Sequence, residues 1–299
     1  IALYALAGYR LMPALQKIFI SLTSLRVVSP ALDSLHNDLK NLKPIILSKN
    51  EDTLIVNNDI CLKNIHYNYP NASKTALKNI SLTIPVNKTI GLVGATGSGK
   101  TTAVDILLGL LEAQKGTLEV DGRIINNDNR RAWQSSIGYV PQQIFLTDNT
   151  VSANIAFGVD FKDIDEEAVM NAAKIANIHN FIMNELPLNY RTTVGERGIR
   201  LSGGQRQRIG IARALYHKPK VLVLDEATSA LDNLTEKAVM DSVHNSEKNI
   251  TKILIAHRLS SVKNCDKIFL FHKGEIKEQG NFEELLKISD EFKKSVEVN

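Results

Sequence analysis

One nine-residue stretch, GATGSGKTT at residues 94–102, constrains the fold of this chain more than any other feature. It follows a short apolar run at residues 89–93 and precedes a further apolar stretch, so it fits the strand–loop–helix pattern G-x4-G-K-[ST]. The glycines allow backbone N–H groups to curl around an anion, and the start of the helix adds a partial positive charge. The sequence therefore predicts a phosphate-binding loop between a buried strand and a buried helix.

Two side chains of this loop carry chemistry. We expect Lys100 to reach the β- and γ-phosphates of a nucleotide and the hydroxyl of Thr101 to ligate Mg²⁺. The full set of expected nucleotide contacts in the loop is Gly94, Thr96, Gly97, Ser98, Gly99, Lys100, Thr101 and Thr102. The helix that follows is predicted to lie in the core because it is apolar nearly all round, with Ala103, Val104, Ile106, Leu107, Leu110 and Leu111.

A pair of carboxylates, Asp225 and Glu226, follows the apolar run at residues 221–224. Adjacent residues at the end of a strand point in different directions, so the two can take different roles. We expect Asp225 to hold magnesium, through water, and Glu226 to act as general base on an attacking water. Catalysis of phosphoryl transfer otherwise depends mainly on positioning and charge stabilisation.

The sequence pattern predicts a long helix followed by an α/β domain. Runs at residues 89–93, 221–224 and 253–256 are apolar on both faces, as in parallel strands that are covered on both sides. Alternating runs near residues 60–84 suggest an antiparallel edge. We expect a helical segment at 1–44, a polar linker at 45–52 and one domain at 53–299, with a helical subdomain at about 145–215.

The first forty residues predict one helix with an apolar seam for packing against other helices. At 1.5 Å per residue it would be roughly 60 Å long, twice the hydrocarbon thickness of a membrane, and Pro13 and Pro30 are expected to kink it. Taken alone, the pattern leaves two readings open, a helix leaving a membrane on its cytoplasmic side or an amphipathic helix docked on a soluble domain. The seam consists of Leu11, Leu15, Ile18, Leu22, Leu25, Val28, Leu32, Leu35 and Leu39.

Net charge and cysteine content exclude few classes of function. A net charge of +4, from 36 basic and 32 acidic residues, argues neither for nor against nucleic acid. The two cysteines, Cys61 and Cys265, fit no metal or redox spacing and are expected to be unpaired thiols. The apolar opening at residues 1–8 is too short to span a bilayer, and we expect the chain to be a piece of a longer protein.

The segment LSGGQ at residues 201–205 resembles the signature sequence of the ABC transporter superfamily. Ser and two Gly before a helical stretch form a second site for an anion at a helix N-terminus. The resemblance implies a P-loop NTPase (RecA-like) fold, ATP and Mg²⁺ as ligands, and a signature that acts in trans on the γ-phosphate held by a partner cassette. Its residues here are Leu201, Ser202, Gly203, Gly204 and Gln205.

Further family elements occur in the expected order between about residues 53 and 298. Tyr69 matches the aromatic that stacks on adenine, and Gln142, with Gln143 as the alternative, matches the glutamine that contacts Mg²⁺ and the attacking water. His257 matches the histidine that contacts the γ-phosphate. The loop that crosses the dimer interface corresponds to Ser229, Ala230, Leu231 and Asp232.

Three features are similar to the exporter branch of the superfamily. A helix is fused before the cassette, and residues 193–198 (TVGERG) resemble the loop that contacts the membrane domain. The 60 residues from Gln142 to Ser202 leave room for a compact helical subdomain but not for the long coiled coil of chromosome-maintenance ATPases. Residues 7–13 are also similar to the last membrane helix of lipid-linked oligosaccharide, polysaccharide and lipid exporters.

The resemblance implies an ATPase that drives export or flipping of a substrate across the inner (plasma) membrane, with a lipid-linked glycan or lipid as the candidate substrate. Its expected partners are ATP, a second copy of the same chain, a transmembrane domain in the full-length chain and the lipid bilayer, but no nucleic acid. Two alternatives remain at this point. One is a soluble ABC ATPase that acts on nucleic acid or ribosomes, and the other is a regulatory module without turnover.

Overall fold

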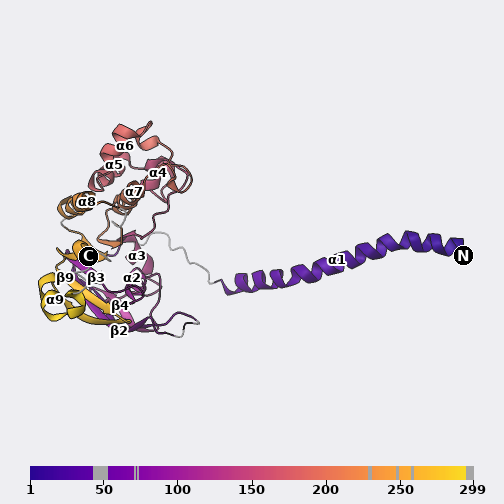
Figure 1. Cartoon of the computed structure of the whole chain (residues 1–299), viewed down its shortest axis with the longest axis horizontal. Helices are drawn as coiled ribbons and strands as arrows, with labels where there is room; N and C mark the ends of the chain where they lie inside the picture. Colours follow the sequence, from indigo (N-terminus) through magenta and orange to yellow (C-terminus); the bar gives the residue numbers. More distant parts are fainter. Residues whose placement is uncertain are drawn as a thin grey trace. The chain divides into compact units, whose positions relative to one another are not determined.

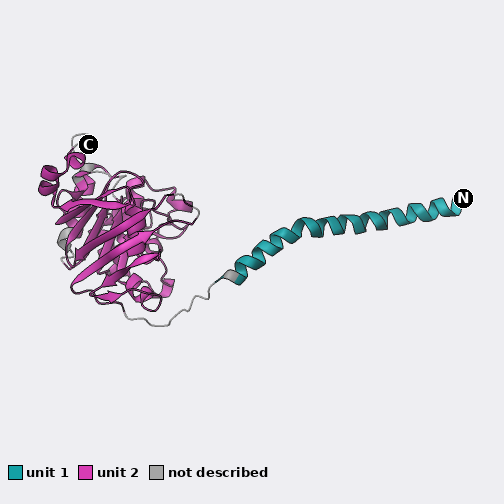
Figure 2. Ribbon diagram, turned by 90° about the horizontal axis from the view of Figure 1, so that it is seen from below, with its two compact units in different colours: residues 1–50 teal, residues 51–299 magenta. Residues whose placement is uncertain are grey.

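The computed structural model describes residues 1–42, 53–70, 72, 74–227, 231–246, 249–256 and 259–293. The chain divides into two compact units, residues 1–50 and residues 51–299, which Figure 2 colours separately. The division lies inside the predicted linker at 45–52, which is outside the described residues.

Unit 1 is a single helix, α1 (Ala2–Asn41), so the predicted long helix is confirmed. It continues through both Pro13 and Pro30, and it is curved rather than broken (Figure 2). The apolar seam is exposed along its whole length, for example 60% at Leu11 and 59% at Leu39. Within the described ranges, α1 is the one helix that is long and apolar enough to cross a membrane, with a mean hydropathy of 1.3.

Unit 2 is built around a six-stranded sheet with the order β10-β9-β3-β8-β7-β6. All neighbouring strands are parallel except β10, which pairs antiparallel with β9 and forms one edge. The predicted strands at 89–93 and 221–224 are confirmed, and the run predicted at 253–256 is a strand that begins two residues earlier. The strands are β3 (Thr89–Val93), β6 (Ile137–Val140), β7 (Val221–Asp225), β8 (Thr251–Ile255), β9 (Lys267–His272) and β10 (Glu275–Gly280).

The sheet separates two hydrophobic cores, and its strands supply side chains to both. In β7, Leu222 and Leu224 pack into the core shared with the helices α4–α8, whereas Val221 and Val223 pack into the other. This alternation follows from the two-residue period of a strand. It also explains why the parallel strands are apolar without interruption.

The antiparallel strands predicted near residues 60–84 are confirmed as a hairpin, but they belong to a second sheet of four strands with the order β2-β1-β4-β5. Its buried face closes the second core together with α2 and the fully buried Trp133. The antiparallel edge of the six-stranded sheet is therefore β10. The strands are β1 (Asp59–Tyr67), β2 (Leu77–Pro85), β4 (Lys115–Val120) and β5 (Arg123–Ile124).

Figure 1 shows α4, α5, α6 and α7 gathered at one end of unit 2, and we call this group of helices the helical subdomain. A bridge between Thr150 and Thr193 joins the start of α4 to the segment before the signature. The helices of the unit are α2 (Lys100–Leu107), α3 (Arg130–Ser135), α4 (Val151–Ile155), α5 (Glu166–Ile175), α6 (His179–Glu185), α7 (Gly203–Tyr216), α8 (Asn233–Ser246) and α9 (Phe282–Ile288).

Helix α2 is shorter than the apolar pattern predicted. It ends at Leu107, whose carbonyl accepts a hydrogen bond from the Trp133 indole at 2.7 Å, and Gly109 follows in the left-handed conformation (φ +66°). A left-handed glycine just beyond the last turn is a common helix stop. Leu110 therefore lies outside the helix and is 59% exposed, so the prediction that it belongs to the core is wrong.

The turn between β4 and β5 depends on Asp121, whose carboxylate accepts backbone hydrogen bonds from Asn57, Asn58 and Asp59 at 2.8, 2.8 and 3.0 Å. Burial acts to raise the pKa of Asp121, but the three donors outweigh it and lower the pKa below its ordinary value. The charged form therefore fastens the start of β1 to this turn.

We expect Asp121→Asn to destabilise unit 2 by about 1 kcal/mol at pH 7, because it weakens hydrogen bonds to a charged acceptor. The depressed pKa means that this contribution is present above the unfolded value of about 3.9 and is lost as pH falls through the folded value. The difference in urea midpoint between parent and variant should therefore be largest near pH 7 and shrink below about pH 4. Exposed Asp128→Asn is the control, and an equal midpoint for the two variants at pH 7 would contradict the assignment.

Candidate active site

The phosphate-binding loop lies between β3 and α2, as predicted, and three glycines give it its shape. Gly94, Gly97 and Gly99 have φ angles of +145°, +76° and +107°, which side-chain-bearing residues rarely adopt. A Cβ at Gly94 would lie 2.2 Å from the carbonyl oxygen of Phe271, so the loop rests directly on β9. Above Gly97 a Cβ would meet no atom within 4 Å, which leaves open space on the outer side of the loop.

Lys100 closes the loop from within. Its ammonium group donates to the carbonyl oxygens of Gly94 at 2.7 Å and Ala95 at 3.0 Å, and the residue is only 4% exposed. Burial lowers the pKa of Lys100, and the nearby carboxylates Glu226 and Asp225 act in the opposite direction. The lysine and both carboxylates are therefore close enough to interact electrostatically.

Ser98 adds a polar group without a protein partner. Its hydroxyl oxygen is buried and makes no hydrogen bond to the described residues, which is uncommon for a buried polar atom. A phosphate oxygen in the loop would satisfy it. The buried hydroxyl, the ammonium of Lys100 and the open space above Gly97 together fit a triphosphate.

The two carboxylates stand where β7 ends. Asp225 is 7% exposed, and its pKa is raised by burial and then by the neighbouring charge of Glu226. Glu226 turns away from the strand with a φ of +48°, and its N–H donates to the carbonyl of Ile255 at 3.0 Å. The two side chains have different partners, Tyr139 for Asp225 and Gln142 for Glu226.

Gln142 follows β6, the neighbour of β7, and reaches the same edge of the sheet. Its side-chain amide donates to the Glu226 carboxylate at 2.7 Å. The carboxyl ends of neighbouring parallel strands meet at one edge, which is where α/β proteins bind their ligands. This edge brings together side chains that lie 84 residues apart in the chain.

Tyr69 lies beside the helix that follows the loop. Its hydroxyl is 3.2 Å from the hydroxyl of Thr102, and its ring packs edge-on against Tyr67 with centroids 5.1 Å apart. The ring is 40% exposed, which leaves a surface for a flat ligand next to the phosphate loop. Thr96 and Thr101 are also exposed there.

The signature segment begins α7 in the helical subdomain. Ser202 is the N-cap, with its hydroxyl accepting from the N–H of Gln205 at 3.2 Å while the Gln205 side chain accepts from the N–H of Ser202 at 2.7 Å. Gly203 and Gly204 follow as the first two residues of the helix, and Leu201 is buried. The reciprocal pair is a capping box, which fixes the direction in which the helix N-terminus points.

The remaining predicted site residues are His257 and those of the loop at 229–232. Ser229, Ala230 and His257 lie outside the described residues. Leu231 is buried, and Asp232 caps α8 by accepting from the N–H of Thr235 at 2.9 Å and its hydroxyl at 2.7 Å.

Two residues near the carboxylates were missed by the sequence reasoning. The Tyr139 hydroxyl lies 3.4 Å from the Asp225 carboxylate, and burial together with Asp225 raises the pKa of Tyr139 to about 12. Asp105 on α2 adds a third carboxylate whose pKa is raised by burial. Tyr139 lies three residues before Gln142 in the sequence, and this short separation is what could have indicated that Tyr139 lies near the site.

The oxygen donors predicted for Mg²⁺, on Thr101, Gln142 and Asp225, are of the type that this hard cation prefers. In the part of the chain that the structure describes, there is no group of three or more His, Cys, Asp or Glu side chains that could hold a metal by themselves. Thr101, Gln142 and Asp225 would leave coordination positions open for phosphate oxygens of a bound nucleotide.

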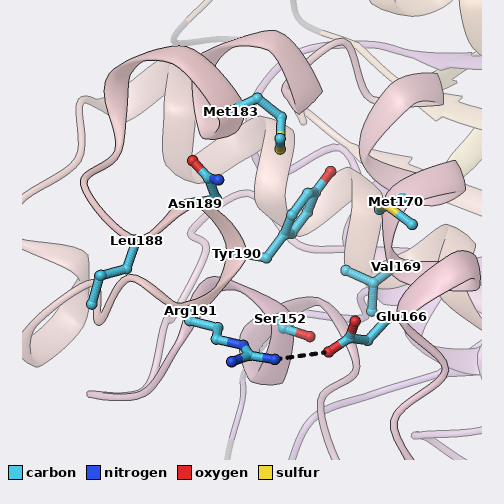
Figure 3. Close-up of a pocket in the computed structure, with 9 residues that line it drawn as sticks. All are labelled: Ser152, Glu166, Val169, Met170, Met183, Leu188, Asn189, Tyr190 and Arg191. Atoms are coloured by element: carbon cyan, nitrogen blue, oxygen red, sulfur yellow. Dashed lines mark ion pairs between the residues drawn. The ribbon is translucent and has the colours of Figure 1, made fainter.

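A cavity of about 320 Å³ in the helical subdomain contains none of the predicted site residues. Figure 3 shows its apolar lining, including Met170, Met183 and Tyr190, with a 4.0 Å ion pair between Arg191 and Glu166 at its rim. The Tyr190 hydroxyl is 2.7 Å from the His179 imidazole, which ties the segment 189–191 to α6.

The chain is similar in sequence to several known transport proteins. A lipid A-core flippase of Saccharophagus degradans is 46% identical over 225 residues, and multidrug resistance protein 1 of Entamoeba histolytica is 45% identical over 233 residues. These alignments cover 75% and 77% of this chain but 38% and 18% of the two relatives, so the chain spans well under half of their length.

Among solved structures, a bacterial Atm1-family ABC exporter with ATP bound matches with a TM-score of 0.81 and 30% identity, over 96% of this chain and 50% of that one. The ABC transporter family itself matches over residues 77–229, a range that contains the phosphate loop, Gln142, the signature and both carboxylates. The chain belongs to the ABC transporter family.

Proposed function

We propose that this chain is the ATP-binding and ATP-hydrolysing part of an ABC exporter, and that two copies of it close on two molecules of Mg-ATP. The observation that carries the proposal is the meeting of Lys100, Asp225, Glu226 and Gln142 at one edge of the sheet. A phosphate loop alone would support nucleotide binding only. The added carboxylates and amide supply what hydrolysis needs.

Within each site, Lys100 binds the β- and γ-phosphates, and the N–H groups of the glycine-rich loop surround them. Mg²⁺, when bound, neutralises phosphate charge, and Thr101, Gln142 and Asp225 are the residues that would hold it. Glu226 takes the proton of the attacking water as general base, and Gln142, 2.7 Å from it, orients that water. His257 contacts the γ-phosphate, and Tyr69 stacks on the adenine.

The signature serves the site of the partner copy. The N-terminus of α7 carries two glycines that allow close approach of a phosphate, and the capping box holds that end in place. The segment 229–232 crosses the interface. Because each proposed site position in this chain is chemically competent, we propose a symmetric homodimer in which ATP bridges the two copies and hydrolysis lets them part.

The exposed apolar helix α1 supports a membrane location, with unit 2 on the cytoplasmic side of the inner (plasma) membrane. The relatives named as a flippase, a multidrug resistance protein and an exporter support transport over a soluble ATPase on nucleic acid or ribosomes. A lipid or lipid-linked glycan is the substrate class we favour, given the flippase. ATPase activity of the full-length protein in lipid, stimulated by such lipids but not by peptides or drugs, is the test.

Glu226→Gln should retain ATP binding and lose turnover by about 10²–10⁴-fold, because the amide cannot accept the proton of the attacking water. The measurement compares steady-state phosphate release with equilibrium binding of ATP. Exposed Glu283→Gln is the control. Turnover within twofold of the parent would remove Glu226 from the role of base.

Lys100→Ala should weaken ATP binding itself by about ten- to a hundredfold, the effect of losing one or two charge-assisted hydrogen bonds. Binding is measured by titration of the isolated chain with a fluorescent ATP analogue. Lys88→Ala, which removes an exposed lysine just before β3 that pairs with Asp266 just before β9, should bind like the parent. Unchanged affinity in Lys100→Ala would contradict the phosphate contact.

Ser202→Phe should spare ATP binding by monomers and block hydrolysis by dimers, because the bulky ring would occupy the space of the partner's γ-phosphate. The variant also loses a helix cap, at a cost of about 1 kcal/mol. Asp165→Ala is the matched control, because Asp165 caps α5 through the N–H groups of Glu167 and Ala168 and lies outside the proposed site. Full-rate hydrolysis by parent monomers would show that the signature does not act in trans.

A further inference from the structure

The helix that begins with the signature also holds the chain segment immediately after Gln142. Ile144 and Phe145 contact one face of α7 at Gly210 and Arg213, which lie three positions apart and so share that face. This contact joins two parts of the proposed site through one rigid helix.

Gly210 is the point of closest approach. A Cβ at this position would lie 2.5 Å from Cδ1 and 2.9 Å from Cγ1 of Ile144, so the absence of a side chain lets Ile144 lie against the helix backbone. A glycine inside a helix costs roughly 1 kcal/mol relative to alanine. Close packing against Ile144 accounts for its presence here.

Arg213 fastens the next residue. Its guanidinium donates to the carbonyl of Phe145 at 2.9 Å, to the carbonyl of Asn154 at 2.8 Å and to the Asn154 side chain at 3.2 Å, and it stacks 4.8 Å from the Phe157 ring centroid. Asn154 is itself fully buried and accepts from the N–H of Thr147 at 3.0 Å. One planar cation therefore joins α7, α4 and the segment that leads back to Gln142.

The position of Gln142 depends on this segment because the glutamine side chain is exposed and, among the described residues, its one hydrogen-bond partner is Glu226. Two residues separate Gln142 from Phe145, whose carbonyl oxygen accepts a hydrogen bond from Arg213. A displacement of about 1 Å in a positioning group can cost on the order of a hundredfold in rate.

We propose that Arg213 is a positioning residue for Gln142 of its own chain, acting by fixing Ile144 and Phe145 to the signature helix. The inference rests on the proposed function, since it assumes that Gln142 takes part in hydrolysis. Arg213 lies eleven positions after Ser202 on the same helix. It would act on the site of its own chain, whereas Ser202 serves the site of the partner.

The first test uses the pair Gly210 and Ile144. Gly210→Ala adds a methyl group that must displace Ile144, and it should lower the turnover number about tenfold or more while ATP affinity stays within twofold. Ile144→Ala removes all three atoms that the methyl group would meet, so the double variant should regain the turnover of Ile144→Ala alone. Turnover in the double variant as low as in Gly210→Ala would overturn the proposal.

The second test places Arg213→Ala in one copy of a mixed dimer of the full-length protein, purified through two different affinity tags. Ser202→Phe in one copy disables the site of the other copy, which that signature serves. The remaining working site belongs to the copy that carries Ser202→Phe and uses Gln142 of that copy. Arg213→Ala in the copy that supplies this Gln142 should lower turnover about tenfold or more, and in the other copy by less than twofold.

Arg208→Ala in the copy that supplies Gln142 is the matched control, because Arg208 also lies on α7 and donates to backbone carbonyls, those of Asn177 at 2.9 Å and Gly204 at 3.4 Å, rather than to Phe145. Its contact with the signature does not matter there, since Ser202→Phe already disables the signature of that copy. Equal losses from Arg213→Ala in either copy, or a loss matched by Arg208→Ala, would overturn the proposal in favour of general destabilisation. Absence of turnover in the parent dimer, or full turnover when both copies carry Ser202→Phe, would instead refute the proposed function.

Discussion

The burial of one ammonium group organises the nucleotide end of this molecule. Lys100 sits inside its own loop, 4% exposed, bonded to two backbone carbonyl oxygens and close to two carboxylates. A cation so placed is tolerated only where charge and hydrogen-bond partners compensate its lost hydration. The loop, the strand end that carries Asp225 and Glu226 and the strand behind the loop must therefore keep a fixed arrangement.

Parallel strand pairing provides that arrangement. The strands β3, β8, β7 and β6 lie side by side, and the segments that follow them all emerge at one edge. The edge collects the phosphate loop after β3, the carboxylates at the end of β7 and Gln142 after β6. Two separate cores, one on each face of the sheet, hold the strands from both sides, so the edge is rigid although the residues on it come from loops.

The helical subdomain extends this framework away from the sheet. Its principal helix, α7, presents the capped signature at one end and grips the segment after Gln142 along its side. A helix is stiff over this length, so the two contacts are linked mechanically as well as in sequence. In an exporter, such a link would let the same helix serve the partner's nucleotide and its own chain's glutamine.

Much of this could be read from the amino-acid sequence, because the deciding features are local. Gly94, Gly97 and Gly99 define the loop by backbone conformation alone, the apolar runs define β3 and β7, and the heptad-like leucines define α1. Ser202 with Gln205 three residues later is a capping box that is visible in the sequence.

The tertiary structure alone decided what depends on contacts between distant segments. The end of α2 at Leu107 depends on the indole of Trp133, 26 residues away, and the apolar pattern that ran on to Leu110 carried no sign of it. The separate sheet of β1 and β2 follows from their pairing with β4, and the closeness of Tyr139 to Asp225 follows from the register of β6 on β7. The hydrogen bond from Arg213 to the Phe145 carbonyl joins residues that lie 68 positions apart in the chain. Periodicity and turn chemistry describe each segment by itself, whereas these features arise only when folding brings separate segments into contact.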